Sequence, residues 1–274
     1  MKITNRIIKS LLGAGLALLA TFGITHTAAA QAKGKGVALP AHAQEIEPGV
    51  YYLGRAKDRA GRDVDGIAFV HYRQFAAKSA KAGGGGHTKS DPCYAFLYSG
   101  VHWQTPKDYV VSPTIADAPD GALFLDQIGY ALANWELGAG RQIFGNGTVG
   151  EVDPSLVGNI NINGVNEVTF APIADPSTLA YAFVWGVFNG SPSKRELTEW
   201  DVVLRDDVPW SATGEPGKYD FWDAFAHESG HAAGMAHPSD TCTEETMYRF
   251  ISSGEIKKRT LNDGDLAGIA ALYK

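Results

Sequence analysis

The sequence predicts an α+β fold for most of the chain, because β-like runs alternate with two segments of helical periodicity. Residues 179–185 and 199–204 are rich in branched and aromatic side chains, as expected of strands. Residues 122–137 repeat apolar side chains at helical spacing, and a second helix is predicted from residue 220 onward. The apolar stripe of the first helix consists of Leu123, Ile128, Leu132 and Trp135.

The first 30 residues have the pattern of a secretory signal. Lys2, Arg6 and Lys9 give a basic start, residues 11–24 are apolar, and Ala28–Ala30 form a small-residue cleavage site. The apolar run is short for a membrane span, although an uncleaved membrane anchor is the alternative. No later run approaches membrane length. We therefore expect cleavage, no membrane association afterwards, and a secreted, extracellular protein.

Residues 31–90 are predicted to form an N-terminal extension. Within it, residues 50–55 and 66–73 are β-like, with a charged, glycine-containing stretch between them that favours a hairpin. Residues 75–90 are a predicted linker, because the four glycines at 83–86 behave as flexible coil. Two interpretations stay open. The extension is a pro-segment that keeps the protein inactive until export, or it is a spacer with an accessory hairpin.

The main domain is predicted over residues 91–274. It begins with a strand inside 103–112, followed by the first helix. Residues 145–166 are rich in glycine and asparagine and are predicted as loop, and a short strand follows at 167–171. Asn262 or Asp263 caps a last helix. The inward side chains of that helix are predicted to be Leu266, Ile269, Ala270 and Tyr273.

One stretch carries the chemistry, because residues 227–237 have the pattern H-E-x-x-H-x-x-G-x-x-H. His227 and His231 are four residues apart, so on a helix they share one face and can bind one zinc ion. Glu228 lies beside that face, where it can take a proton from a zinc-bound water as general base. A buried helix with satisfied core histidines is the alternative, but packing alone gives no reason for this combination.

A glycine completes the predicted metal site. Gly234 tolerates positive φ, so it can end the helix and return the chain sharply, which makes His237 the third ligand. Three protein ligands leave a fourth coordination position open, as in a catalytic zinc site. Asp220 is a suitable N-cap for the helix. The opposite face of the helix is expected to pack on the sheet through Trp222, Phe225, Ala226, Ser229, Ala232 and Ala233.

These motifs resemble the metzincin zinc peptidases, and specifically their matrixin, or matrix metalloproteinase-like, branch. Met247 in Glu245–Tyr248 is similar to the methionine of the metzincin Met-turn, which forms a floor beneath the metal. The tail 259–273 resembles the terminal matrixin helix. Matrixins usually have proline after the tyrosine, whereas this chain has Arg249, which affects the predicted wall of the specificity pocket rather than the zinc site.

The resemblance implies more about the fold and the substrate. It implies a twisted, mostly parallel mixed sheet with an antiparallel edge strand, an active-site helix and a small C-terminal subdomain. Residues 179–185 resemble the edge strand along the metzincin cleft, where an extended peptide can pair as an added strand. An ordinary core strand is the alternative. The implied substrate-binding residues are Leu179, Ala180, Tyr181, Ala182 and Tyr248.

Only two cysteines occur, Cys93 and Cys242, and in an exported protein a pair most simply forms a disulfide. That bond would join the start of the domain to the loop before Met247. The alternative is a cysteine switch, in which a pro-segment thiolate occupies the open zinc position. Matrixins place that cysteine in Pro-Arg-Cys-Gly, and the surrounding residues 91–94 (Asp-Pro-Cys-Tyr) do not match, so we favour the disulfide.

A second metal is not expected to be zinc. The remaining histidines all lie far upstream of the loops in which matrixins hold a structural zinc. They are His26, His42, His71, His87 and His102. Calcium could bind near Asp206–Asp207 or Glu151–Asp153, although a solvated acidic surface is the favoured interpretation.

Charge limits the partners. The chain has 24 Lys and Arg against 30 Asp and Glu, and loss of the signal leaves 21 basic residues and a net charge of −9. Acidic chains without a basic run are poor ligands for nucleic acid or anionic membranes. We expect a monomer that meets a peptide or protein substrate.

Together these features predict a secreted zinc-dependent endopeptidase. Two alternatives stay open. One is a non-catalytic secreted zinc module that binds protein or glycan, against which the intact Glu228 argues. The other is a zinc amidase that acts on non-protein amides such as cell-wall cross-links, against which the predicted edge strand argues.

Overall fold

The computed structural model describes residues 36–73, 92–152 and 162–274. These residues belong to one compact unit, Lys35–Lys274. The predicted signal, the linker at 75–90 and Asp153 lie outside the described residues. The predicted domain boundary at residue 91 also lies outside the described residues, so it stays a prediction.

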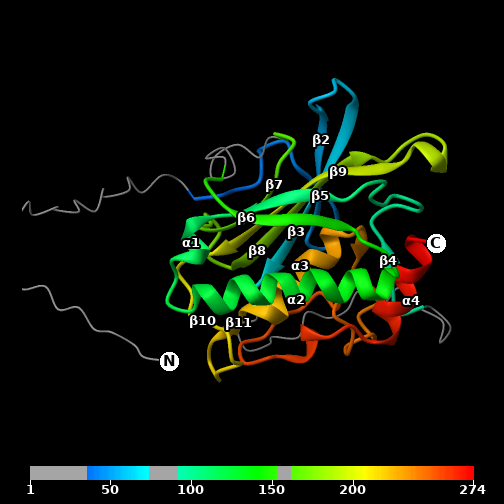
Figure 1. Ribbon diagram of the computed structural model, residues 1–274. Coiled ribbons are helices and arrows are strands. Elements are labelled where there is room, and N and C mark those ends of the chain that lie inside the picture. The colour runs from blue at the N-terminus through cyan, green and yellow to red at the C-terminus, as the bar shows by residue number, and fades with distance from the viewer. Residues whose placement is uncertain (1–35, 74–91, 153–161) are drawn as a thin grey trace, which may run out of the picture. The chain divides into compact units, whose positions relative to one another are not determined.

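Within the described residues, eight strands form one mixed sheet in the order β1-β2-β3-β8-β9-β7-β5-β6 (Figure 1). Two short pairs, β10-β11 and β12-β4, complete the β-structure found there. The strands of the large sheet are β1 Gln44–Glu47, β2 Val50–Lys57, β3 Asp63–Tyr72, β5 Lys107–Val111, β6 Phe144–Val149, β7 Asn166–Ala171, β8 Thr178–Val187 and β9 Glu196–Arg205. The short strands are β4 Ala95–Phe96, β10 Trp210–Ser211, β11 Tyr219–Asp220 and β12 Met235–Ala236.

The strand pairing in the sheet changes from parallel to antiparallel at β9. β5, β6, β7 and β9 pair in parallel, whereas β8 is antiparallel to β9 and to β3. The predicted hairpin is confirmed, since β2 and β3 pair antiparallel, and β1 continues that antiparallel region. The strand predictions at 167–171, 179–185 and 199–204 are also confirmed.

The longer helices lie on one side of the sheet. α3 contacts β8 and β9, and α2 packs on α3 in front of it (Figure 1). α2 also contacts α4, while α1 packs on α2 and β7. The helices are α1 Pro113–Ala116, α2 Gly121–Ala139, α3 Phe221–Ala232 and α4 Asp263–Leu272, with short 3-10 turns η2 Pro192–Lys194 and η3 Lys257–Arg259. No helix among the described residues is long and apolar enough to cross a bilayer.

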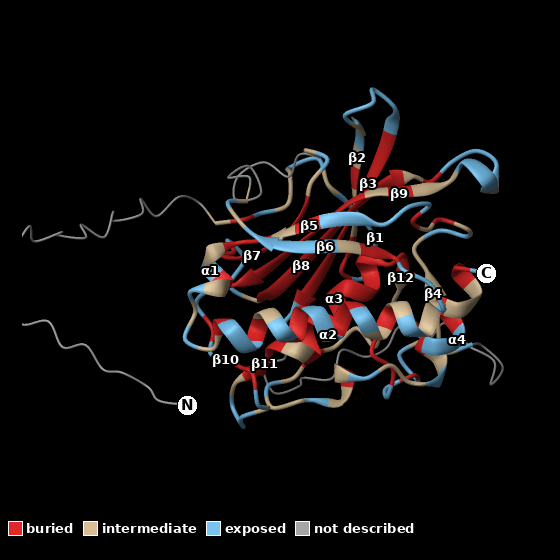
Figure 2. Ribbon diagram, in the orientation of Figure 1, coloured by how far each residue is buried: buried red, intermediate tan, exposed pale blue. Residues whose placement is uncertain are grey.

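The main core fills the space between the sheet and these helices, where buried residues meet in Figure 2. Ile128, Leu132 and Trp135 of α2 enter it as predicted, and Phe225 of α3 is fully buried among them. A smaller apolar cluster joins Val37 to side chains of β2, β3 and β8, among them Leu53, Val70 and Phe183. The N-terminal residues are therefore part of this packing.

Three predictions about surfaces and loops are wrong. Leu123 and Leu266 are 47% and 41% exposed, because each lies at the margin of its helix's buried face. Residues 144–149, predicted in part as loop, form β6. Gly145 and Gly147 suit that strand, since a Cβ on Gly147 would lie 2.4 Å from the Tyr109 ring of β5.

The prediction that residues 179–185 form an exposed edge is also wrong for this chain. β8 is antiparallel as expected, but β3 pairs along the side that was expected to be free, so β8 is an interior strand. The first and last strands of the sheet are β1 and β6. The cause is the N-terminal hairpin, which extends the sheet by strand addition instead of standing apart from it.

Candidate metal centre

Helix α3 begins and is fixed as its sequence predicts. The side chain of Asp220 accepts the N–H of Asp223 at 2.9 Å, which caps the helix. Two buried indoles tie its backbone to the core. Trp135 Nε1 donates to the carbonyl of Ala226 at 2.9 Å, and Trp103 Nε1 donates to that of Ala232 at 2.8 Å. The helix is therefore held at both ends of the segment that carries the histidines.

Four imidazoles meet at one point. His227 and His231 come from α3, His237 from the segment after β12, and His71 from β3, and one ligand atom of each lies within 4.8 Å of the others. Nε2 of His227 and Nε2 of His237 are 3.3 Å apart. The glycine turn therefore does bring His237 to the two helical histidines.

The turn depends on Gly234. Its φ is 99°, a conformation that other residues rarely adopt, and a Cβ there would lie 3.0 Å from the carbonyl oxygen of Val101. The N–H of Gly234 donates to the His231 carbonyl at 2.9 Å, which closes the helix end. His237 follows after the two residues of β12.

Hydrogen bonds orient two of the rings. Nδ1 of His227 lies 2.5 Å from the Thr246 carbonyl oxygen, and Nδ1 of His231 lies 2.9 Å from that of Met235. A carbonyl only accepts, so Nδ1 of each ring carries the proton and Nε2 keeps its lone pair. This arrangement is typical of metal-ligating histidines, whose outer nitrogen is fixed by a second hydrogen bond.

Met247 packs against α3, the helix that carries His227 and His231. It is fully buried, and a Cβ on Gly230 of α3 would be 2.2 Å from its sulfur, so the glycine makes room for it. Its turn is fixed by Asp265 of α4, whose carboxylate accepts the N–H of Thr246 at 2.6 Å and of Met247 at 3.1 Å. Asp265 thus holds the residue whose carbonyl orients His227.

Glu228 is buried beside the four rings. It is 0% exposed, and its Oε2 lies 3.3 Å from Nε2 of His71, while neither of its oxygens accepts a hydrogen bond from the described residues. Burial raises the pKa of Glu228 well above its usual value. A carboxylate in this position has high proton affinity, which suits a general base.

Burial also keeps the imidazoles neutral. It lowers the pKa of His231 to about 3, and it lowers the pKa of His71, His227 and His237 well below the usual value, with further lowering from neighbouring rings. Neutral imidazole is the form that binds a metal.

The donor set fits zinc. Nitrogens at about 2.05 Å from a tetrahedral ion stand about 3.3 Å apart, which is the separation of the His227 and His237 Nε2 atoms. Nε2 of His231 is buried and has no hydrogen-bond partner among the described residues, an arrangement that is costly unless a ligand satisfies it. The residues that would hold the ion are His227, His231, His237 and His71.

His71 is the residue that sequence reasoning missed. Its distance along the chain from the H-E-x-x-H motif excluded it from the predicted site, and a fourth position open to water was expected. A signal did exist, since His71 follows four apolar residues, 67–70, in a β-like run, where a polar side chain needs a partner. The sequence does not indicate which partner.

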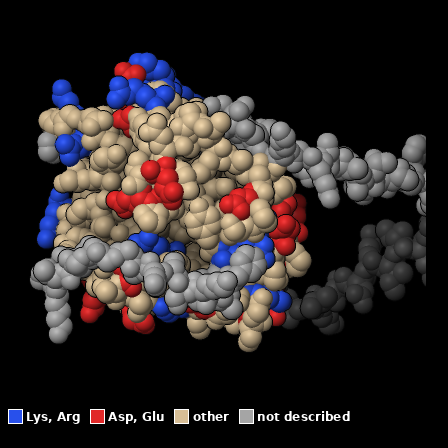
Figure 3. Space-filling model, turned by 180° about the vertical axis from the view of Figure 1, so that it is seen from behind, with Lys and Arg blue, Asp and Glu red and all other residues tan. Residues whose placement is uncertain are grey.

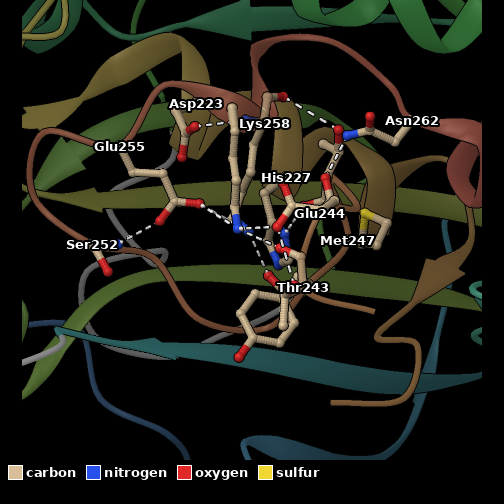
Figure 4. A network of polar contacts seen from close by, with 12 residues as sticks. Asp223, His227, Thr243, Glu244, Met247, Ser252, Glu255, Lys258 and Asn262 are labelled. Carbon is tan, nitrogen blue, oxygen red and sulfur yellow. Dashed lines mark hydrogen bonds and ion pairs between the residues drawn. The ribbon is translucent and has the colours of Figure 1, made fainter. Parts of the chain in front are cut away.

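A buried lysine stabilises the loop after Met247. Figure 4 shows Lys258 among the groups that it joins. Its Nζ donates to the Tyr248 carbonyl at 2.9 Å and lies 3.5 Å from a Glu255 carboxylate oxygen, and its backbone N–H donates to Asp223 at 2.8 Å. The first turn of α3 is thereby joined to the loop that would border a substrate pocket.

The predicted substrate-binding residues of β8 do not face solvent. Leu179, Ala180, Tyr181 and Ala182 are all buried in apolar clusters, β3 covers the main chain of their strand, and Tyr248 is half-buried. Two large cavities, of about 640 and 530 Å³, lie elsewhere, and no histidine of the cluster lines either.

A disulfide joins Cys93 and Cys242, as the sequence favoured, with Cα atoms 5.5 Å apart. Neither sulfur is therefore a free thiol for the metal. Seen from behind, the described surface carries acidic side chains in small groups, while Lys and Arg lie mostly toward its margins (Figure 3). The calcium prediction at Asp206–Asp207 stays untested.

Comparison with known proteins agrees with the geometry. The family described as Matrixin matches residues 176–274, which include α3, the glycine turn, Met247 and α4. Matrilysin of Homo sapiens is 32% identical over 97 residues, which are 35% of this chain and 32% of matrilysin. The chain therefore matches about a third of the length of that relative. By its metal-centre motifs and by these matches, the C-terminal part of the chain is matrixin-like. This likeness supports its assignment as a metallopeptidase.

Proposed function

We propose that the protein is a secreted zinc-dependent endopeptidase, with Glu228 as general base and His227, His231 and His237 as metal ligands. The observation that carries the proposal is the convergence of three neutral imidazoles from a helix and its return turn, with a buried carboxylate next to them. The matrixin likeness of residues 176–274 supports the same reaction class. Secretion rests on the sequence pattern of residues 1–30 and on the disulfide.

The chemistry divides between the metal and the chain. Zinc, when bound, supplies a Lewis acid that polarises the scissile carbonyl and acidifies water. The imidazoles hold it as neutral donors, and the carbonyls of Thr246 and Met235 keep two of them oriented. Glu228 takes the proton of the attacking water and passes it to the leaving amine. The raised proton affinity of its buried carboxylate suits the first transfer, and the second transfer returns Glu228 to its unprotonated form.

Substrate binding is proposed to use β8. The side of β8 that β3 covers is complementary to an extended peptide, which would add there in place of β3 as an antiparallel strand and fix the scissile bond beside the metal. Leu179, Ala180, Tyr181 and Ala182 are the proposed contacts on that side, and Tyr248 is the proposed contact on the opposite wall. Peptide and protein substrates follow from this mode, which favours the endopeptidase over the amidase alternative.

The test combines chelation with one variant. The purified protein is incubated with an unfolded protein, and new fragments are identified by mass spectrometry. We expect a strong chelator to abolish cleavage and added zinc to restore it. Glu228→Gln should retain zinc and lose turnover by a factor of about 10²–10⁴, the usual contribution of general base catalysis. Cleavage that survives chelation, or a fully active Glu228→Gln, would refute the proposal.

A further inference from the structure

β3 occupies the side of β8 that the proposed function reserves for substrate. The pairing is antiparallel and runs from Asp65 opposite Gly186 to Tyr72 opposite Thr178. This is the main-chain arrangement by which an extended peptide adds to a sheet edge. A segment of the chain itself therefore takes the place of a substrate strand.

The same strand inserts a histidine into the metal centre. The ring of His71 lies 4.5 Å from that of His227 and 5.3 Å from those of His231 and His237, measured between centroids. The register of β3 shifts between His71 and Tyr72. Such irregularities re-aim side chains, and here the result is that His71 is 1% exposed and points at the other three rings.

A second side chain of β3 closes the site. Phe69, two residues earlier and therefore on the same face of the strand, stacks on His231 with ring centroids 3.6 Å apart and planes 8° from parallel. It also contacts the edge of His237 at 5.6 Å. Phe69, His231 and Glu228 are all 0% exposed, and of the four cluster histidines only His237 is partly exposed, so β3 shields the metal centre from a substrate.

The strand is fixed on both sides of the histidine. At one end, Gly66 lies so close to Trp185 of β8 that a Cβ would be 2.4 Å from the indole. At the other end, Arg73 forms a parallel bridge with Ile251, which belongs to the loop after Met247. β3 therefore passes over the metal centre from the sheet to the opposite wall of the site.

We propose that His71 is a fourth protein ligand of the zinc and that β3 blocks the substrate position, so that the full chain turns over substrate only in the minor population in which β3 is displaced. This inference rests on the proposed function. His71 Nε2, at 3.3 Å from Glu228 Oε2, lies where the water that Glu228 would activate must lie. Displacement of β3 opens the fourth coordination position and the free side of β8 together, so one event creates both parts of the active site.

Nitrogen NMR of the histidine rings tests ligation without reference to activity. The metal-free full chain is labelled at its imidazole nitrogens and titrated with zinc. We expect one equivalent to shift the metal-bound nitrogens of His71, His227, His231 and His237 together, while His42 does not shift. If zinc shifts the other three cluster histidines but leaves His71 unchanged, the inference is wrong.

A variant tests the consequence for turnover. His71→Leu retains apolar volume but cannot bind metal, and His42→Leu is the matched control, since His42 is an exposed histidine of the same N-terminal segment. We expect His71→Leu to weaken zinc binding at least about tenfold, as loss of a ligand should exceed the loss of a supporting hydrogen bond. It should also raise peptide cleavage about tenfold or more, because turnover scales with the open population.

The two proposals fail in different ways. Ligation by His71 in the NMR titration without cleavage by either the full chain or His71→Leu would overturn the peptidase assignment and leave the four-histidine site. Cleavage by the full chain at the rate of His71→Leu would overturn the block by β3 and leave the peptidase assignment. If His71→Leu does not fold, the titration of the unaltered chain decides ligation alone.

Discussion

Replacing Asp265 tests how the metal centre is supported from below. Its carboxylate is 0% exposed and accepts the N–H groups of Thr246 at 2.6 Å, Met247 at 3.1 Å and Asn262 at 3.0 Å. Thr246 and Met247 are themselves buried, so Asp265→Ala leaves two buried donors without an acceptor. Each costs about 1–3 kcal/mol, and we expect a loss of about 2–6 kcal/mol in the free energy of unfolding.

The same replacement should also lower the affinity for zinc. Asp265 holds Thr246, whose carbonyl orients His227, and loss of such outer hydrogen bonds lowers metal affinity about 10–100-fold. Urea unfolding measures the first effect, and competition with a chromogenic chelator measures the second. Asp265→Asn keeps one acceptor oxygen, so its stability and its zinc affinity should both lie between those of the unaltered chain and of Asp265→Ala.

Asp263→Ala is the matched control, because it removes an exposed carboxylate from the same helical turn. Only the interaction with the helix dipole is lost there, about 0.3–1 kcal/mol, with zinc affinity unchanged. If Asp265→Ala is no more destabilising than Asp263→Ala, or if it binds zinc as the unaltered chain does, the argued link from α4 to His227 is wrong.

Three further predictions concern packing and pH. Gly230→Ala should lower stability by about 1–2 kcal/mol in urea unfolding, because overpacking against Met247 and the rigid ring of Trp135 exceeds the gain of about 1 kcal/mol in helix propensity; a stabilised variant would contradict this packing. Gly234→Ala should cost about 1–3 kcal/mol and weaken zinc binding measured by chelator competition, since its φ of 99° is strained for alanine; unchanged affinity would show that the turn does not place the third ligand. Burial raises the pKa of Glu199 to about 7, so the folded state binds more protons than the unfolded state and its contribution to stability falls as pH rises from about 4.5 to about 7, by at most about 3 kcal/mol. Unfolding of Glu199→Gln across that range should show a smaller decline, and an equal decline would exclude Glu199 as a cause.

Much of the metal centre could be predicted from local sequence. The spacing of His227 and His231, the glycine after them and the capping Asp220 act within one or two helical turns, where periodicity and backbone freedom decide the structure. Met247 was recognised by its resemblance to a known turn, and the structure packs it against Gly230 of α3 in a turn that Asp265 holds. That carboxylate was not predicted, because nothing local distinguishes it from any acidic residue in the first turn of a helix.

The strands were predictable as segments, but their neighbours were not. β6 was predicted in part as loop because its glycines lower strand propensity, and only the close approach of Tyr109 makes them favourable. β8 was expected to have a free edge, whereas pairing with β3 makes it interior. Pairing between strands more than a hundred residues apart depends on which apolar faces meet, and a single sequence does not specify that partner.

By itself the sequence determined the H-E-x-x-H helix, its return turn, the two cysteines and the presence of an N-terminal hairpin, since each depends on short-range spacing or on a count. Only the tertiary structure decided that the hairpin joins the sheet and that His71 meets the other three histidines. The physical reason is that sheet register is fixed by burial along the whole strand. The side chain that reaches the metal centre is therefore set by the packing of β3 on β8.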